Sequence, residues 1–126
     1  KSIPLLEKLI TQVKRASGRG FLKGLDGRKI WVKSEHSAPN YLLQSAGAIV
    51  MKQALVLLYA SAKKENLDFK FVGNIHDEYQ TQVLEGHSER FGVLAVQAII
   101  NAGVELNMNC PLDGESKIGN NWYECH

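Results

Sequence analysis

The chain contains 126 residues, of which 44% are hydrophobic and 22% are charged, a composition that suits one compact globular domain. No apolar run approaches the roughly 18 residues that cross a bilayer, and the N-terminus lacks the features of a signal peptide. We therefore expect no membrane partner.

The two cysteines, Cys110 and Cys125, are too few for a recognisable zinc site, and we expect both thiols to be reduced.

Charge is unevenly distributed along the chain. Residues 1–35 contain nine Lys or Arg against three Asp or Glu, whereas residues 36–126 contain six against ten. Positive charge concentrated in this way suits contact with a phosphate backbone, although a solvated surface of mixed charge can have the same composition. The chain opens with Lys1 directly on an amphipathic pattern, so we expect it to be part of a longer protein.

The first predicted elements are a helix and a hairpin. Apolar residues recur at helical spacing from Leu5 to Val13, and "ASGRG" ends this pattern. Two strands are then predicted at residues 20–25 and 28–33, joined by a two-residue turn at Asp26-Gly27.

A long helix follows the hairpin. Ser37 is a suitable cap, Pro39 is tolerated in a first turn, and an apolar stripe continues to about Ala62. The residues predicted to face the core are Leu42, Leu43, Ala46, Ile49, Val50, Ala54, Leu57 and Leu58.

The rest of the chain predicts a second hairpin, a third helix and a closing strand. Ser88 can cap the third helix, Gly103 suits its end, and a short strand is expected at Trp122–Cys125. The order of elements predicts an α+β fold in which antiparallel β-hairpins pack with three helices, as a single domain of residues 1–126.

The second hairpin contains adjacent carboxylates in "FVGNIHDEYQTQV". Because Asp and Glu do not favour strand interiors, His76, Asp77 and Glu78 are predicted to form the hairpin tip. The two carboxylates could there present oxygen ligands to Mg²⁺ or Mn²⁺, with substrate phosphates and waters completing the shell. A solvated acidic turn is the alternative, and His76 is more simply an orienting or packing side chain than a base or a metal ligand.

Four segments, in the same order, resemble the C-terminal palm of family A DNA polymerases, the DNA polymerase I family. They are "GLDGRKIWVKS", "APNYLLQSAGAIVMK", "NIHDEYQ" and "LDGESKIGNNWYECH", and they look especially like the phage replicative branch. "NIHDEYQ" resembles the His-Asp-Glu hairpin of that family. The resemblance covers nearly the whole chain and implies a DNA-directed DNA polymerase acting in the cytoplasm of the host cell. The fingers, exonuclease and first palm strand would lie outside residues 1–126, so we expect this chain alone to be inactive.

The resemblance also implies a role for each residue of the acidic tip. In the family, two divalent ions bridge the attacking 3′-hydroxyl and the triphosphate. Asp77 would ligate metal, Glu78 would support the metals or the primer end, and His76 would orient or pack against the pair. The chain would therefore hold only part of a two-Mg²⁺ site.

The partners implied by the resemblance are primer–template DNA and deoxynucleoside triphosphates. Asn40 and Gln44 stand four residues apart and share one helix face, where a cap and an exposed polar residue would be the simplest interpretation. The matching residues of the family reach the minor groove, where every base pair offers acceptors at nearly equivalent positions. His36 is a candidate for the same groove, and Arg28 and Lys29 for the DNA backbone, although solvent exposure explains all three as well.

Two other functions fit parts of the sequence. A small metal-dependent phosphodiesterase could use Asp77, Glu78 and His87, and a non-catalytic nucleic-acid-binding module could use residues 1–35 as a basic surface. We also expect the fragment to expose apolar side chains of its first and long helices, which the parent enzyme would cover. Such a surface favours a two-fold homodimer.

Overall fold

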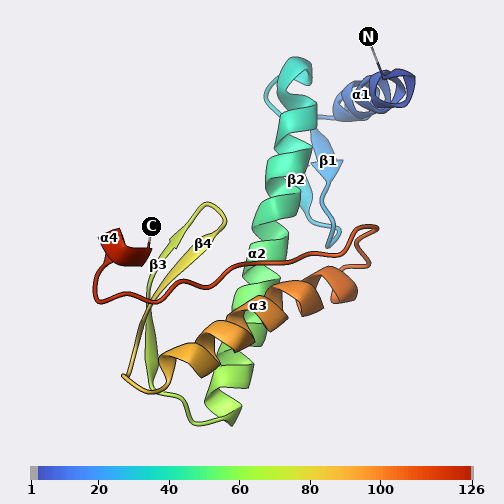
Figure 1. The fold of residues 1–126 in the computed structure, drawn as a ribbon. Helices are drawn as coiled ribbons and strands as arrows, with labels where there is room; N and C mark the ends of the chain where they lie inside the picture. Colours follow the sequence, from blue (N-terminus) through green and yellow to red (C-terminus); the bar gives the residue numbers. More distant parts are fainter. Residues whose placement is uncertain (1–2, 126) are drawn as a thin grey trace. The chain divides into compact units, whose positions relative to one another are not determined.

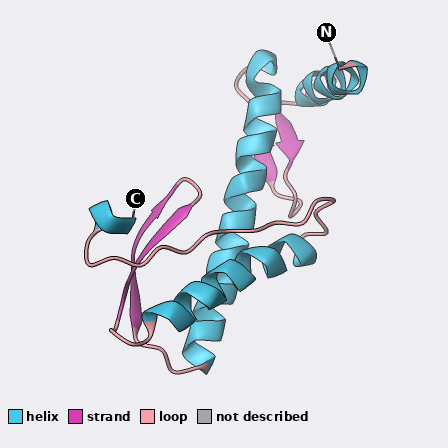
Figure 2. Ribbon diagram, viewed as in Figure 1, coloured by secondary structure: helices cyan, strands magenta, loops and turns pink. Residues whose placement is uncertain are grey.

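In the computed structural model, residues 3–125 are described, and they fall into two compact units, Lys1–Ile49 and Val50–His126. The long helix α2 (Ala38–Lys64) begins in the first unit and ends in the second (Figure 1). The expectation of a single domain stays a prediction. The mixture of helices and small antiparallel sheets confirms the predicted α+β class (Figure 2).

The first unit contains α1 (Pro4–Ser17) and a hairpin of β1 (Phe21–Lys23) and β2 (Lys29–Trp31). Pro4 suits the first turn of α1, because that turn has no intrahelical partner for the missing N–H. Its small core consists of Val13, Leu22 and Ala38, with Ala16, Ile30, Val32 and Leu42 packed against them. The apolar row at the start of α1 lies outside this core, since Leu5 is 79% exposed and Leu9 is 51% exposed.

The first hairpin is shorter than predicted, and its register differs by one residue. Leu22 pairs with Ile30 and Lys23 with Lys29, whereas a two-residue turn at Asp26-Gly27 would have paired Lys23 with Ile30. The Gly24 carbonyl accepts from the Gly27 N–H, and Gly27 has φ +82°, which forms a three-residue loop with a final left-handed glycine. A slip of one residue reverses which side chains face the core. The observed register puts Leu22 inside and Phe21 outside.

A short 3₁₀ turn, η1 (Glu35–Ser37), leads into α2. Ser37 therefore belongs to this turn, not to a cap of the predicted kind, and Leu43 is 70% exposed although the pattern placed it in the core. The continuous helical segment Glu35–Lys64 is long and apolar enough to cross a membrane by length and composition, which the sequence pattern did not predict. That match is weak evidence, because core helices of globular proteins meet the same criteria.

The second unit packs a longer hairpin against helices. Strands β3 (Phe69–Ile75) and β4 (Glu78–Val83) place Phe69, Phe71, Tyr79 and Val83 against a core of Leu58, Ala62, Phe91 and Ala98. The Phe69 ring centroid lies 5.1 Å from that of Phe91 and 5.4 Å from that of Phe71. Edge-on and tilted aromatic contacts of this kind add to the stabilisation from burial alone.

Helix α3 (Ser88–Glu105) differs from the prediction at both ends. His87 is the N-cap residue and Ser88 is already helical, while the helix continues two residues beyond Gly103. The Arg90 guanidinium forms two hydrogen bonds with the Glu65 carboxylate, at 2.6 and 2.7 Å. This pair links the first turn of α3 to the segment that follows α2, and it lowers the pKa of the Glu65 carboxyl.

The predicted closing strand is a short helix, α4 (Trp122–Cys125). The Asn121 side chain accepts a hydrogen bond from the Glu124 N–H, and the Glu124 carboxylate accepts one from the Asn120 N–H at 2.8 Å. These reciprocal bonds resemble a capping box, which starts a helix where a strand was expected. Both cysteines, Cys110 and Cys125, are free, as predicted.

Candidate metal and DNA-binding sites

The acidic turn joins β3 to β4, and its shape depends on a bulge at Val72. Phe71 pairs with Thr81 but Gly73 pairs with Gln80, so Val72 is an extra residue in β3. Beyond the bulge, Asn74 lies opposite Tyr79 and Ile75 lies opposite Glu78, which leaves a turn of two residues. Without the bulge, the strands would meet in a longer loop. The bulge therefore determines which residues occupy the turn.

The turn consists of His76 and Asp77, while Glu78 is the first residue of β4. His76 has φ +54°, a left-handed conformation that histidine adopts more readily than most other non-glycine residues. The predicted three-residue tip is thus wrong for Glu78, because the adjacent strand pairing begins one residue earlier than expected. Glu78 and Gln80 share one strand face, and the Gln80 amide donates a hydrogen bond to the Glu78 carboxylate.

The two carboxylates differ in their surroundings. Asp77 is exposed and, within residues 3–125, its carboxylate accepts no hydrogen bond and forms no ion pair with a side chain, whereas Glu78 is half-buried and bonded to Gln80. Among the same residues, no three His, Cys, Asp or Glu side chains converge on one point. Adjacent carboxylates on a turn fit Mg²⁺ only as part of a larger ligand set, such as substrate phosphates and waters.

The position of His87 argues against the phosphodiesterase that combined it with Asp77 and Glu78. The Asp68 N–H donates to the His87 Nδ1 at 3.0 Å, at the end of the hairpin away from the turn. Strand β4 separates His87 from Asp77 by roughly 20 Å. His87 therefore connects the start of β3 to the N-terminus of α3, and that alternative is wrong in its choice of residues.

The five candidate DNA-binding residues lie in the first unit, and all five are exposed. Asn40 and Gln44 are on the first two turns of α2 and His36 is in η1, so these three follow one another at intervals of four residues. Residues at this spacing lie on the same side of a helix. The side chains of Asn40 and Gln44 therefore form one exposed row on α2, and His36 precedes it in η1.

Arg28 and Lys29 have different surroundings, although they are neighbours in sequence. Arg28 forms an ion pair with Asp26 at 2.6 Å, which lowers the pKa of the Asp26 carboxyl and raises that of the guanidinium. Lys29 is in β2, with its Nζ 4.9 Å from the centroid of the Phe21 ring. A phosphate would have to compete with Asp26 for Arg28 but not for Lys29.

Gly47 is a feature that the sequence pattern did not single out. It lies three residues after Gln44 and seven after Asn40, on the same face of α2. A Cβ built on Gly47 would have no atom within 4 Å, so nothing in the described residues requires a glycine here. Glycine inside a helix costs about 0.5–1 kcal/mol relative to alanine. A partner approaching this face would explain that cost.

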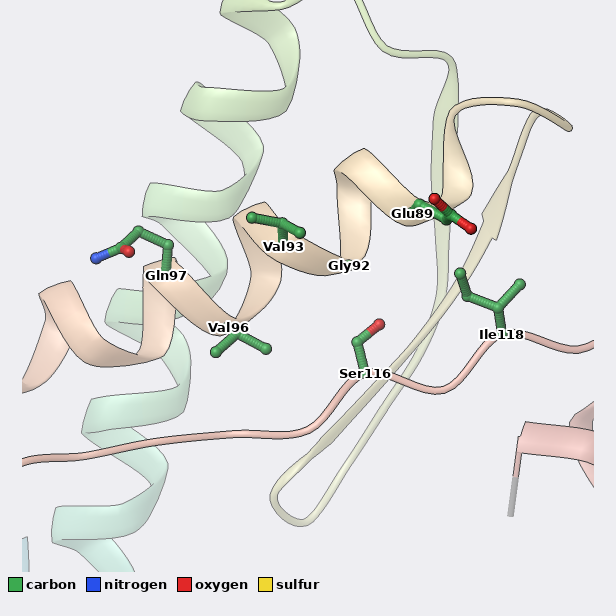
Figure 3. Close-up of a pocket in the computed structure, with 7 residues that line it drawn as sticks. All are labelled: Glu89, Gly92, Val93, Val96, Gln97, Ser116 and Ile118. Carbon is green, nitrogen blue, oxygen red and sulfur yellow. The ribbon is translucent and has the colours of Figure 1, made fainter.

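An open pocket of about 430 Å³ lies elsewhere, between α3 and the extended segment that precedes α4 (Figure 3). Its lining includes Glu89, Val93, Ser116 and Ile118, and none of the predicted site residues. The segment approaches α3 closely, because the Ser116 Oγ leaves no room for a Cβ on Gly92. The pocket thus marks the packing of the C-terminal segment, and no sequence signal predicted it.

The family model described as DNA polymerase family A matches residues 10–124. The chain belongs to DNA polymerase family A. It is 35% identical to a DNA-directed DNA polymerase of Escherichia phage Phieco32 over 98% of its own length, and 39% identical to that of Enterobacteria phage T3 over 86%. It spans 21% and 16% of those two relatives, respectively.

A solved polymerase structure has a similar fold. The POL domain of Pol1 from M. smegmatis, in complex with DNA primer-template and dNTP, matches with a TM-score of 0.68 over 76% of this chain and 19% of that one. Their sequences are 21% identical. The resemblance to family A that was inferred from four short segments is therefore confirmed for the family and for the fold.

Proposed function

We propose that this chain is the C-terminal palm portion of a DNA-directed DNA polymerase, with Asp77 as its metal-ligating carboxylate. The supporting observation is the turn itself, where an exposed carboxylate without a partner among residues 3–125 stands at the end of the β3–β4 hairpin. A structural aspartate in a turn commonly hydrogen-bonds nearby backbone amides. Asp77 makes no such bond with a described residue, so its oxygens are available to a ligand.

The surroundings suggest separate roles for the three residues. The Gln80 amide holds the Glu78 carboxylate in one orientation, so Glu78 would act from a fixed position beside the metal or the primer end. His76 would set the direction of the turn through its positive φ, which makes it a positioning residue. Two bound Mg²⁺ ions would supply charge stabilisation for in-line displacement at the triphosphate.

The exposed row on α2 is proposed to contact primer–template DNA. Side-chain amides of Asn40 and Gln44 can donate to the purine N3 and pyrimidine O2 acceptors of the minor groove, which do not depend on sequence. Gly47, on the same face, removes the methyl group that would hinder close approach of a duplex. His36 would extend the row, and Lys29 and Arg28 would contact phosphates.

The activity would need segments beyond this chain, because it spans only about a fifth of the relatives it matches. We propose that the isolated chain does not extend a primer, that the complete enzyme uses deoxynucleoside triphosphates, and that it works in the cytoplasm of the host cell. The basic-module alternative shares the DNA contacts, but it gives no reason for the acidic turn.

A chimera tests the proposal directly. Residues 10–124 would replace the matching segment of the phage T3 polymerase, and primer extension would be measured with Mg²⁺ and all four triphosphates. We expect template-dependent extension by the chimera and none by the isolated chain. Asn40→Ala with Gln44→Ala should raise the KM for primer–template, whereas Lys52→Ala, on an exposed position of the same helix, should not. A folded chimera that binds DNA but never extends it would contradict the proposal.

A further inference from the structure

The outward face of the β1–β2 hairpin carries aromatic and basic side chains together. Cross-strand pairs place Phe21 beside Trp31 and Lys23 beside Lys29 on that face, while Leu22 and Ile30 face the core. Side chains of directly paired residues lie on the same side of a sheet. The one-residue difference from the predicted register is what brings these four side chains outward.

The aromatic pair is close and partly open to solvent. The Phe21 and Trp31 ring centroids lie 5.9 Å apart in an edge-on arrangement, and Trp31 is 69% exposed. The Lys29 Nζ lies 4.9 Å from the Phe21 centroid, and the Arg19 guanidinium carbon lies 5.7 Å from it. Both cations lie near the Phe21 ring. The exposed surface of the Trp31 indole therefore remains available for stacking by another flat group.

The cations of this face keep their charge free for a ligand. Asp26 is the nearest acidic residue in the hairpin, and Arg28 already pairs with it. Within residues 3–125, Arg19, Lys23 and Lys29 form no ion pair. An exposed indole that packs against the Phe21 ring, where two unpaired cations lie, costs solvation without adding to the core, so this arrangement suits an anionic ligand with flat apolar groups.

We propose that the outward face of the β1–β2 hairpin binds single-stranded DNA, with an unpaired base stacked on Trp31 and phosphates on Lys23, Lys29 and Arg19. Proteins that bind single strands without sequence preference combine a basic groove with aromatic rings on which bases stack. A duplex offers phosphates but keeps its base faces covered. The inference rests on the proposed function in taking DNA as the partner and in placing a phosphate at Lys29, and it adds a second surface to the row on α2.

Fluorescence of Trp31 provides the test. The chain has two tryptophans, so Trp122→Phe leaves Trp31 as the single indole. We expect an oligo-dT strand to quench this fluorescence at low salt and to bind more tightly than a duplex of the same length. Inorganic polyphosphate should bind with little quenching, because it has no bases to stack.

Variants separate stacking from charge. Trp31→Ala should weaken binding of oligo-dT about tenfold. The affinity of Trp31→Phe should lie between those of Trp31→Ala and the parent chain. Lys23→Gln with Lys29→Gln should reduce the slope of log K against log salt by about 1.4. Tyr123→Ala, which removes a ring that is 90% exposed, is the matched control and should bind like the parent chain.

Two results would overturn the inference: equal affinity of Trp31→Ala and the parent chain for oligo-dT, or equal quenching by polyphosphate. Circular dichroism of each variant shows whether the fold is retained, and Trp31→Phe keeps the test informative if Trp31→Ala unfolds. The Asn40 and Gln44 variants of the chimera report on duplex contact independently. Failure of this inference is therefore distinguishable from failure of the proposed function.

Discussion

The two hairpins share a motif and differ in almost every physical respect. The β1–β2 hairpin has three-residue strands, buries Leu22 and Ile30 on its inner face, and places Lys and aromatic side chains outward. The β3–β4 hairpin has longer strands, turns its aromatic rings inward, and ends in an acidic turn. The first hairpin therefore carries the proposed phosphate contacts, and the second carries the proposed ligands of a divalent cation.

The difference extends to the units that contain them. Residues 1–49 contain nine Lys or Arg against three Asp or Glu, and residues 50–126 contain six against ten. The second unit has an aromatic core of Phe69, Phe71, Tyr79 and Phe91, whereas the first buries few large side chains. A well-packed hairpin can hold an exposed turn in a fixed position, which a metal site requires. A short hairpin on a small core is sufficient to display charges.

The largest expected effect comes from Asp77→Asn. In the chimera with the phage T3 polymerase, this change should reduce kcat at least about 100-fold, because a neutral amide cannot anchor a divalent ion beside phosphates. In the isolated chain it should leave the free energy of unfolding unchanged or slightly higher, since repulsion from Glu78 is relieved. Primer extension and urea denaturation measure the two quantities.

The matched control for this change is Asp113→Asn, at an exposed aspartate outside the hairpin. It should leave extension unchanged. If the Asp77→Asn chimera extends primers at the parental rate, Asp77 is an ordinary turn residue and the contrast between the hairpins loses its functional meaning.

The elements that sequence alone predicted well are those with long apolar periodicity. Helices α2 and α3 were found because residues such as Ala54, Leu58 and Ala98 recur at helical spacing over many turns. The acidic turn was located correctly to within one residue, because charge at that position excludes a buried strand. The bulge at Val72, which sets the exact turn, has one signal in the local composition, because Gly73 beside it is a glycine inside a strand pattern.

The failures have physical causes too. Asp26-Gly27 suggested a two-residue turn. The hydrogen bond from the Gly27 N–H to the Gly24 carbonyl instead closes a three-residue loop, which shifts the register of the strands by one residue. The predicted strand at Trp122–Cys125 is a helix, and the capping-box spacing of Asn121 and Glu124 is the signal in the sequence that indicates it. The open space around Gly47 could not be predicted, because it depends on what packs nearby.

The two cores provide the next test. Phe91→Ala should lower the free energy of unfolding of the second unit by about 3–4 kcal/mol, and Leu22→Ala should lower that of the first by about 2–3 kcal/mol. Phe91 is 6% exposed and Leu22 is 5% exposed, so each substitution by alanine leaves a cavity. Hydrogen exchange read by mass spectrometry should show faster exchange in β3, β4 and α3 for the first variant, and in β1 and β2 for the second.

This experiment also examines the single-domain prediction for residues 1–126. If either variant accelerates exchange by the same factor in both hairpins, the units unfold together and the chain is one cooperative domain. If each variant accelerates exchange only in its own unit, the two units on either side of Ile49 unfold independently. Phe21→Ala, on the outward face of β1, is the control that removes an aromatic ring without opening the core.

A smaller effect is expected from pH. Burial raises the pKa of Tyr79 to about 12, while a backbone hydrogen bond at Leu55 acts in the opposite direction, and the hydroxyl donates to the Met51 carbonyl. In the unfolded chain this hydroxyl loses its proton near pH 10. Between these values the unfolded state releases a proton that the folded state retains, so the unfolding free energy falls as pH rises from 10 to 12.

The comparison of the parent chain with Tyr79→Phe isolates this contribution from Tyr41, Tyr59 and Tyr123, which both proteins retain. The difference between their unfolding free energies should stay constant from pH 7 to 9 and shrink above pH 10. A difference that is constant to pH 12 would mean that the Tyr79 hydroxyl is not protected by the hairpin core.

The smallest expected effect, and the one that tests the first unit alone, comes from Gly47→Ala. A Cβ at this position meets no atom within 4 Å, so the change should stabilise α2 by about 0.5–1 kcal/mol, the helical preference for alanine. If the face that carries Asn40 and Gln44 lies against DNA, the added methyl group should at the same time raise the KM of the chimera for primer–template several-fold.

Ala60→Gly, at an exposed position of the same helix, is the inverse control: it should cost a similar free energy and leave the KM unchanged. Stability and DNA affinity that both improve in Gly47→Ala would show that no partner approaches this face. Opposite changes in the two quantities are expected, because a glycine that weakens its own helix is retained most simply where a ligand needs the space.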